Sequence, residues 1–282
     1  MKNLFSGLLL ILALGCGDSG TKAPEEKAKE QSKGNITVEP ALPSTVSNTL
    51  GPFKIEELTR EQWFGVYSDK KKVGFQKLWA RKETVNGKPM LVVELGLDMA
   101  LPTPEGARLR VRKLNHFELE TPHGLVYALD SEEVKGTDGK SVINQIEARR
   151  TDNGMEIAVS EKGITQKHVV EGLAGSALEE FAVEAWLRKR GPVKGESHEM
   201  ELTDLQKRKR VKRTATVERE RTLRLLGKEV EVRVVKITDS DGKSTVVAYG
   251  PDDLTTVSMH LPDLGLVLRQ ETKEQALGRT GN

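Results

Sequence analysis

The sequence predicts a mainly β protein of the α+β class, in which one well-defined helix accompanies a curved antiparallel sheet or two sheet-rich lobes. Three observations predict it. After Gly51, apolar and polar residues alternate in short runs, as in half-buried strands. Turn signals separate these runs at intervals of about 10 to 15 residues, which is typical of antiparallel hairpins. Strands do not alternate with helices, so a doubly wound parallel sheet is not expected.

The first strands are expected at residues 63–68, 72–84 and 90–101. Asn86-Gly87 between the last two predicts a tight hairpin, because both residues tolerate a positive φ. Similar signals at Asp138-Gly139, Asn153-Gly154 and Lys162-Gly163 extend this meander to about residue 170. Gly65 and Gly74 flank the first turn, where glycine indicates a bulge or a close approach of another backbone.

One helix is predicted over residues 177–190. Ser176 and Glu179 have the spacing of a capping box at its start. Basic residues in the last turn suit the negative end of the helix dipole, and Gly191 followed by Pro192 ends the helix. Its apolar face, which should cover one side of a sheet, consists of Leu178, Phe181, Ala182, Ala185 and Trp186.

The helix divides the folded region 52–282 into a lobe at 52–172, a helical segment at 173–191 and a lobe at 192–277. The second lobe is expected to hold strands near 198–202 and 208–225, a hairpin whose turn contains Asp241-Gly242, and a closing strand. Two similar lobes and one large curved sheet are both compatible with this order.

The N-terminus resembles a bacterial lipoprotein precursor. Lys2 precedes an apolar stretch that ends at Gly15, which is the shape of a signal peptide and is shorter than the about 20 residues that span a bilayer. Small residues come directly before Cys16. The resemblance implies that residues 1–15 are removed, and that Cys16 then carries acyl chains, palmitate among them, that hold the protein on a membrane. Residues 16–51 contain too few apolar side chains to fold and predict a disordered tether.

Composition excludes several classes of function. The formal net charge is only +2, so nucleic acid is not an expected partner. Cys16 is the single cysteine, so the folded region has no disulfide, and no thiol remains there for nucleophilic catalysis. Aromatic residues make up only 4% of the chain, which disfavours a carbohydrate platform built from stacked rings.

No catalytic or metal motif is present, and no catalytic residue, metal site or cofactor is assigned. The five histidines are far apart in the sequence, and neither a nucleophile elbow nor a phosphate-binding loop occurs. The basic run at 205–224 predicts a solvated strand, with an anionic surface as the alternative partner.

The stretch at 59–75 resembles the opening hairpin of exported bacterial proteins in which a β-rich region precedes a transglutaminase-like domain. The resemblance rests on Trp63, on Gly65-Val66-Tyr67 and on Lys72-Val73-Gly74-Phe75, with echoes at 225–235 and 263–277. It implies the β-rich region alone, because the Cys, His and Asp of the catalytic domain have no counterpart here.

Together these patterns predict a non-catalytic, lipid-anchored binding or scaffolding protein of the cell envelope. Export to the periplasm is expected, and Gly17 after the cysteine favours the outer membrane. The ligand is a lipid, a peptide or a partner protein. An accessory subunit of a separate transglutaminase-like enzyme is one alternative. An enzyme with dispersed site residues such as His116, Glu118 and His123 is another. The possible binding face consists of Leu95, Leu97, Met99 and Leu101 on one strand side, and of Trp186, for which core packing is the other interpretation.

Overall fold

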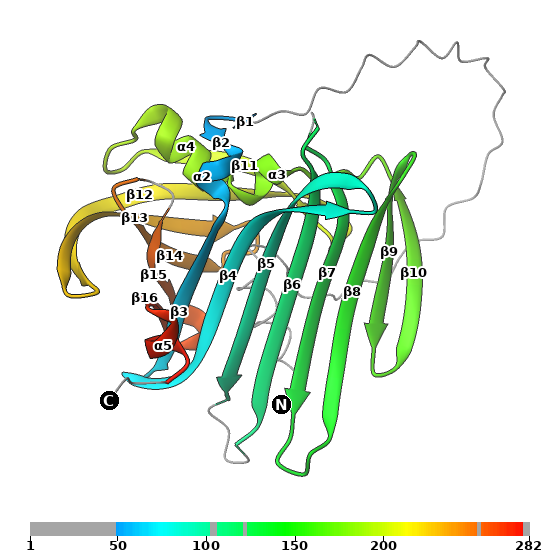
Figure 1. Ribbon diagram of the computed structural model, residues 1–282, viewed down its shortest axis with the longest axis horizontal. Helices are drawn as coiled ribbons and strands as arrows, with labels where there is room; N and C mark the ends of the chain where they lie inside the picture. Colours follow the sequence, from blue (N-terminus) through cyan, green and yellow to red (C-terminus); the bar gives the residue numbers. More distant parts are fainter. Residues whose placement is uncertain (1–48, 102–105, 121–122, 253–254, 279–282) are drawn as a thin grey trace.

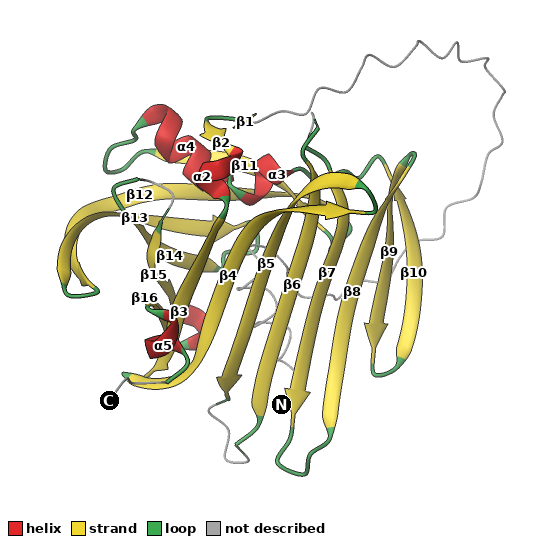
Figure 2. Cartoon of the chain, in the orientation of Figure 1, coloured by secondary structure: helices red, strands yellow, loops and turns green. Residues whose placement is uncertain are grey.

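The fold is one large antiparallel sheet that curls around its own inner face, in a computed structural model that describes residues 49–101, 106–120, 123–252 and 255–278 (Figure 1). The sheet has 14 strands in the order β10-β9-β8-β7-β6-β5-β4-β3-β16-β15-β14-β13-β12-β11. A mainly β fold with few helices is therefore confirmed, as Figure 2 also shows. Cys16 and residues 17–48 of the expected tether lie outside the described residues, whereas Thr49–Leu50 near its expected end form a short strand paired with Phe53–Lys54.

Hairpin connections build the N-terminal half of the sheet, β3 to β10. Asn86 and Gly87 both have positive φ, 51° and 79°, as a tight two-residue turn requires. The three strands expected first are confirmed, each within a few residues of its predicted ends. The bounds are β3 Arg60–Ser68, β4 Lys71–Val85, β5 Lys88–Ala100, β6 Arg108–Glu118, β7 Leu125–Lys135, β8 Ser141–Thr151, β9 Gly154–Glu161 and β10 Ile164–Glu171.

The C-terminal half, β11 to β16, belongs to the same sheet. The last strand pairs antiparallel with the first long one, so that Leu266 lies opposite Ser68 and Glu271 opposite Trp63. The sequence was compatible with either two separate lobes or one large sheet. The pairing of β16 with β3 shows that the chain forms one sheet. The bounds are β11 Ser197–Asp204, β12 Lys209–Leu225, β13 Lys228–Asp239, β14 Ser244–Tyr249, β15 Thr256–Leu261 and β16 Leu266–Glu271.

Helices α2 Ile55–Leu58, α3 Ala177–Glu180 and α4 Ala182–Arg190 lie across one end of the curled sheet, and α5 Lys273–Ala276 lies beside β3, away from them (Figure 1). The helix expected at 177–190 is present but interrupted at Phe181, which leaves the helical φ and ψ region. Its end is confirmed, because Gly191 is left-handed with φ 53° and closes the helix on Leu187. The other short elements are β1 Thr49–Leu50, β2 Phe53–Lys54 and the 3₁₀ turn η1 Pro262–Leu264.

The predicted capping box is wrong. The Ser176 side chain makes no cap hydrogen bond. The Glu179 carboxylate instead accepts a hydrogen bond of 2.8 Å from the backbone N–H of Thr203 in β11. A tertiary partner has replaced the local one, and the helix start is thereby tied to the edge of the sheet.

Gly65 and Gly74 behave as expected at close approaches. A Cβ on Gly74 would lie 2.2 Å from the backbone oxygen of Asp98, and one on Gly65 would lie 2.6 Å from the Glu271 carboxylate. The pairing of β3 with β4 also shifts register between Val66 and Tyr67, which is the predicted bulge.

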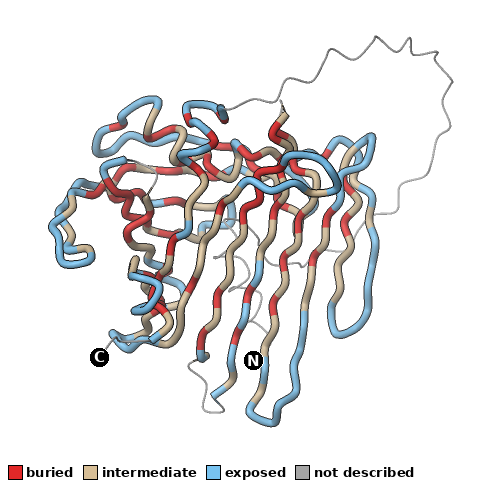
Figure 3. The backbone as a smooth tube through the Cα atoms, viewed as in Figure 1, coloured by how far each residue is buried: buried red, intermediate tan, exposed pale blue. Residues whose placement is uncertain are grey.

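Most of the core lies on the inner face of the curled sheet. Buried residues gather beneath the helices and along the strands (Figure 3). Val232, Val234 and Ala248 alternate with inner-face residues of β13 and β14, and with Val257 they form a separate cluster on the other face. One cluster packs α2 and α3 against β5 to β9 and includes Phe53, Leu91 and Ile157. A second joins β3, β5, β6, β15 and β16 around Val66, while a third packs α4 against β11 to β14 around Leu187. The helices therefore cover the inner face, and both halves of the sheet contribute to the space below them.

Candidate functional site

A cavity of about 180 Å³ lies between the two halves of the sheet, beneath α3 and α4. Strands β3 to β7 form one wall, β11, β12, β14 and β15 form the other, and the segment from Gly175 to Glu184 closes it. Alternation along each strand turns every second side chain inward, so that residues far apart in sequence meet here. Apolar side chains from both halves line it, among them Leu78, Val93, Leu95 and Phe117 from one half, and Val247 and Met259 from the other.

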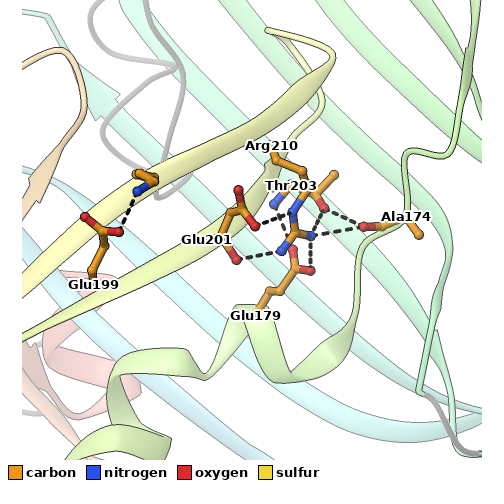
Figure 4. Close-up of polar contacts among 7 residues, drawn as sticks. Ala174, Glu179, Glu199, Glu201, Thr203 and Arg210 are labelled. Carbon is orange, nitrogen blue, oxygen red and sulfur yellow. Dashed lines mark hydrogen bonds and ion pairs between the residues drawn. The ribbon is translucent and has the colours of Figure 1, made fainter.

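A latch joins the edge strand β11 to the start of α3 (Figure 4). The Arg210 guanidinium is hydrogen-bonded to the Glu179 carboxylate and to the Ala174 carbonyl oxygen, and the Thr203 hydroxyl donates to the same carbonyl at 2.7 Å. On the other side of the segment, the Leu125 N–H donates to the Gly175 carbonyl oxygen. The segment before the helix thus connects β7 to β11 and holds the roof of the cavity in place.

Three ionisable groups meet under α4. Burial raises the pKa of the Glu184 carboxyl to about 7, against the opposing effect of the nearby Arg60 charge. Burial lowers the pKa of Arg60, and it raises the pKa of the Tyr249 hydroxyl well above its ordinary value. A carboxyl that titrates near neutrality in a cavity is a recognised mark of functional sites, although structural clusters also produce it.

Several other polar side chains of the walls form pairs. Lys113 lies 3.7 Å from Asp130, nitrogen to oxygen, and Arg213 Nε is 2.6 Å from the Asp239 carboxylate. Asn115 donates a hydrogen bond of 3.1 Å to Glu180 on α3. Charges of both signs therefore line the cavity, and these cations lie beside carboxylates.

Three buried polar atoms on these walls have no hydrogen-bond partner among the described residues: Gln76 Oε1, Asp130 Oδ1 and Arg213 Nη2. The residues that carry them are only 3%, 6% and 2% exposed. Most buried polar atoms in proteins are hydrogen-bonded to protein or to water. Two acceptors and one donor on residues that line the cavity are thus left without a hydrogen-bond partner among the described residues.

The predicted binding face reaches the cavity at one residue only. Leu95 lines it. Leu97 and Met99 are buried in the second core cluster and Leu101 packs against that cluster, because the strand continues past the cavity into the opposite end of the sheet. Trp186 stacks on His198, with ring centroids 5.6 Å apart, within the core of the C-terminal half. Core packing was therefore the right interpretation of Trp186.

His116, Glu118 and His123 do not form a shared site. His116 packs its ring against Tyr127. The Glu118 carboxylate is engaged by Arg150, and His123 contacts the Glu118 backbone oxygen at 3.3 Å. None of the three lines the cavity.

The sequence reasoning missed Arg60, Gln76, Glu184, Arg213 and Tyr249. Two of them carried a signal. Gln76 is in phase with Leu78, and Arg213 is in phase with Val211 and Ala215, so each puts a polar group on the apolar side of a strand. The basic run that includes Arg213 was expected to be a solvated strand, which is wrong for this residue. Arg60, Glu184 and Tyr249 gave no such signal.

Comparison with known proteins gives one structural likeness to describe. No protein-family model matches the chain, and neither does any curated protein. A solved structure of a β-barrel-like protein of a domain of unknown function, DUF1849, from Brucella abortus superimposes with a TM-score of 0.50 at 10% sequence identity. The match covers 75% of this chain and 94% of that one. At this identity the likeness concerns the fold.

Neither a metal site nor a membrane-spanning helix occurs among the described residues. No group of three or more His, Cys, Asp or Glu side chains is arranged there to hold a metal ion. None of the helices in that part of the chain is both long and apolar enough to cross a bilayer.

Proposed function

We propose that this protein is a lipid-anchored binding protein of the bacterial cell envelope, and that it takes a small, partly apolar ligand into the cavity beneath α3 and α4. The observation that carries the proposal is the cavity itself. It is concave, it lies between the halves of the sheet, and it combines an apolar surface with a few convergent polar groups, as ligand sites do.

The size of the cavity limits the ligand. At about 180 Å³ it is smaller than the roughly 300–1,000 Å³ of pockets for drug-sized molecules. A short acyl chain, an amino-acid side chain with its backbone, or a small metabolite fits this volume. A whole phospholipid does not, so a larger ligand would place only one end inside.

Anchoring through Cys16 is the second part of the proposal. The tether of about 34 residues would give the domain a reach of roughly 30 Å from the membrane surface. Two or more acyl chains on Cys16 would hold it there stably, since each buried methylene contributes about 0.8 kcal/mol. The domain would then meet ligands close to the membrane and keep them there.

Filling the cavity tests the binding function. Leu95→Trp places a large ring in the cavity and should abolish ligand binding. Val142→Trp, at a position that is 51% exposed on β8, is the matched control and should bind as the wild type does. Native mass spectrometry of protein purified from its own envelope reads out the bound mass. Bound mass on the Leu95→Trp variant would place any ligand elsewhere.

Cys16→Ser tests the anchor independently. The variant should leave the membrane fraction, whereas a control variant with Ser19→Ala, in the same stretch of the chain, should stay with it. If Cys16→Ser still sediments with membranes, the anchoring proposal is wrong, while the binding proposal is unaffected.

A second candidate function is acid–base catalysis in the same cavity. It is favoured by Glu184, because a carboxyl with a pKa of about 7 can both accept and donate a proton near neutral pH. Turnover of ester, amide or glycoside substrates by the wild type, lost in Glu184→Gln, would support it. Binding without turnover would leave the first proposal standing alone.

A further inference from the structure

We infer that the ligand is an electrically neutral molecule whose hydroxyl or amide groups satisfy Gln76, Asp130 and Arg213 while its apolar body lies against Leu95 and the opposite wall. This inference rests on the proposed binding function and adds the chemical class of the ligand.

The first argument is the set of unmatched polar atoms. Gln76 Oε1 and Asp130 Oδ1 are acceptors, so they require donor groups from a ligand or from water. Arg213 Nη2 is a donor and requires an acceptor. A ligand with one or two N–H or O–H groups and one carbonyl or hydroxyl oxygen complements all three. An amide has both functions in one group, and so does a hydroxyl.

The second argument is the balance of charge. Arg213 is already bonded to Asp239 at 2.6 Å, and Lys113 lies 3.7 Å from Asp130. An anionic ligand would therefore meet two cations beside carboxylates, together with the carboxyls of Glu180 and Glu184. A cationic ligand would meet the cations of Arg60, Lys113 and Arg213. Either would lose its hydration and meet like charges as well as opposite ones, which disfavours charged ligands in a buried site.

The third argument is the placement of the apolar surface. Leu78, Val93 and Leu95 come from the same half of the sheet as Gln76 and Asp130, and Val247 and Met259 face them from the other half. A ligand that bonds to the polar atoms therefore touches apolar side chains on both sides. Apolar contact adds affinity, whereas the polar atoms select which apolar molecule binds.

The test compares small probes on the full chain carrying Cys16→Ser, with affinities from calorimetry and ligand-observed NMR. N-acetyl-leucinamide is the neutral amide and 1,2-hexanediol the neutral hydroxyl compound. N-acetyl-leucine, which is anionic, and leucinamide, which is cationic, are their charged counterparts. Benzene, which has no hydrogen-bonding group, reports only whether the cavity admits an apolar molecule.

At least one neutral polar probe should bind about tenfold more tightly than both charged ones. Gln76→Leu should weaken that probe by about tenfold and leave benzene unchanged, because leucine keeps the volume and removes the acceptor. Gln62→Leu is the matched control: Gln62 is also buried with an unpartnered Oε1, but it does not line the cavity. It should leave every affinity unchanged. The neutral probe with the higher affinity shows whether the site prefers an amide or a hydroxyl ligand.

Three results would overturn the inference. A charged probe that binds as tightly as the neutral ones contradicts the charge argument. Equal affinity in wild type and Gln76→Leu means that water already satisfies Gln76. An equal loss in Gln62→Leu means that the effect is structural. Benzene binding in these cases keeps the proposed cavity function intact, whereas a protein that binds neither benzene nor any polar probe contradicts that function as well.

Discussion

The inner faces of the two halves of the sheet differ in where their buried polar side chains lie. The inner face of β11 to β14 is largely apolar, and α4 packs on it directly, burying Leu187 completely against Val217 and Val235. The inner face of β4 to β7 carries polar side chains midway along its strands, among them Gln76 and Asp130. Against this half the roof packs Ala177 and Phe181 in the first core cluster, and Asn115 also donates a hydrogen bond to Glu180.

The difference explains where the cavity lies. Close packing of helix on sheet requires apolar side chains on both surfaces, as in ordinary protein interiors. The C-terminal half provides them beneath α4 and the N-terminal half provides them beneath α2 and α3, but Gln76 and Asp130 interrupt the apolar face of β4 and β7. The space opens beside these polar side chains. Changes that disturb one half, the other, or their connection should therefore have distinct consequences.

Leu187→Ala breaks the packed side and should have the largest effect. Leu187 is 0% exposed, and its removal leaves a cavity beneath α4. We expect a loss of about 2–5 kcal/mol in the free energy of unfolding, measured by urea denaturation. Leu178→Ala, at a position 41% exposed on α3, should cost under about 1 kcal/mol. Similar losses in both would contradict the packing assigned to α4.

Gly74→Ala tests the close approach of β4 to β5. The new Cβ would meet the Asp98 carbonyl oxygen at 2.2 Å, so the strands must move apart. The expected cost is about 1–3 kcal/mol in chemical denaturation. Gly96→Ala in the neighbouring strand is the control, because no heavy atom lies within 4 Å of its Cβ position. It should be neutral or slightly stabilising.

Glu132→Gln sharpens the account of the polar half. Burial raises the pKa of Glu132 to about 7, from an ordinary value of 4.5. Below pH 4.5 the group is protonated in both states, so folding carries no charge penalty. Between pH 4.5 and 7 the unfolded state has released its proton while the folded protein keeps it, so the free energy of unfolding falls as the pH rises through this range and levels off above about 7.

Glutamine does not titrate, so the variant should gain about 2 kcal/mol over the wild type at pH 8 relative to their difference at pH 4. Urea denaturation of both proteins at the two pH values measures it. A gain that does not change with pH would contradict the titration assigned to Glu132.

Arg210→Met tests the latch between the halves and should have the smallest structural effect. Its loss removes hydrogen bonds to Glu179 and Ala174, at an expected cost of about 1 kcal/mol. Faster amide exchange around Gly175 should accompany it. Lys212→Met, two residues along, breaks only the exposed pair with Glu199 and should cost less than about 0.5 kcal/mol.

Local patterns were enough to predict the hairpins and the helical segment at residues 177–190. The alternation along β4 and β5, the Asn86-Gly87 turn and the stop at Gly191 are encoded in adjacent residues, and each is present in the structure. The break at Phe181 and the failure of the capping box were not predictable in this way. Glu179 accepts a hydrogen bond from the backbone N–H of Thr203, which is 24 residues away and comes near only in the folded protein.

The candidate site was mostly beyond prediction for the same reason. It depends on β3 pairing with β16, about 200 residues apart, which brings Tyr249 and Arg213 opposite Gln76. Leu95 was predicted correctly because its strand was recognised. The sequence did not show that the cavity ends at Leu95 and does not extend along the strand to Leu97. Gln76 and Arg213 show what a stricter reading offers: a polar residue in the apolar phase of a strand marks a place where the core is incomplete.

A crystal structure of the Cys16→Ser protein soaked with the neutral probe that binds best tests the central claim most directly. The account predicts density for the probe between Leu95 and Met259, with its polar groups within hydrogen-bond distance of Gln76, Asp130 and Arg213. A probe bound elsewhere, or a cavity that stays free of it at saturating concentration, would contradict the account.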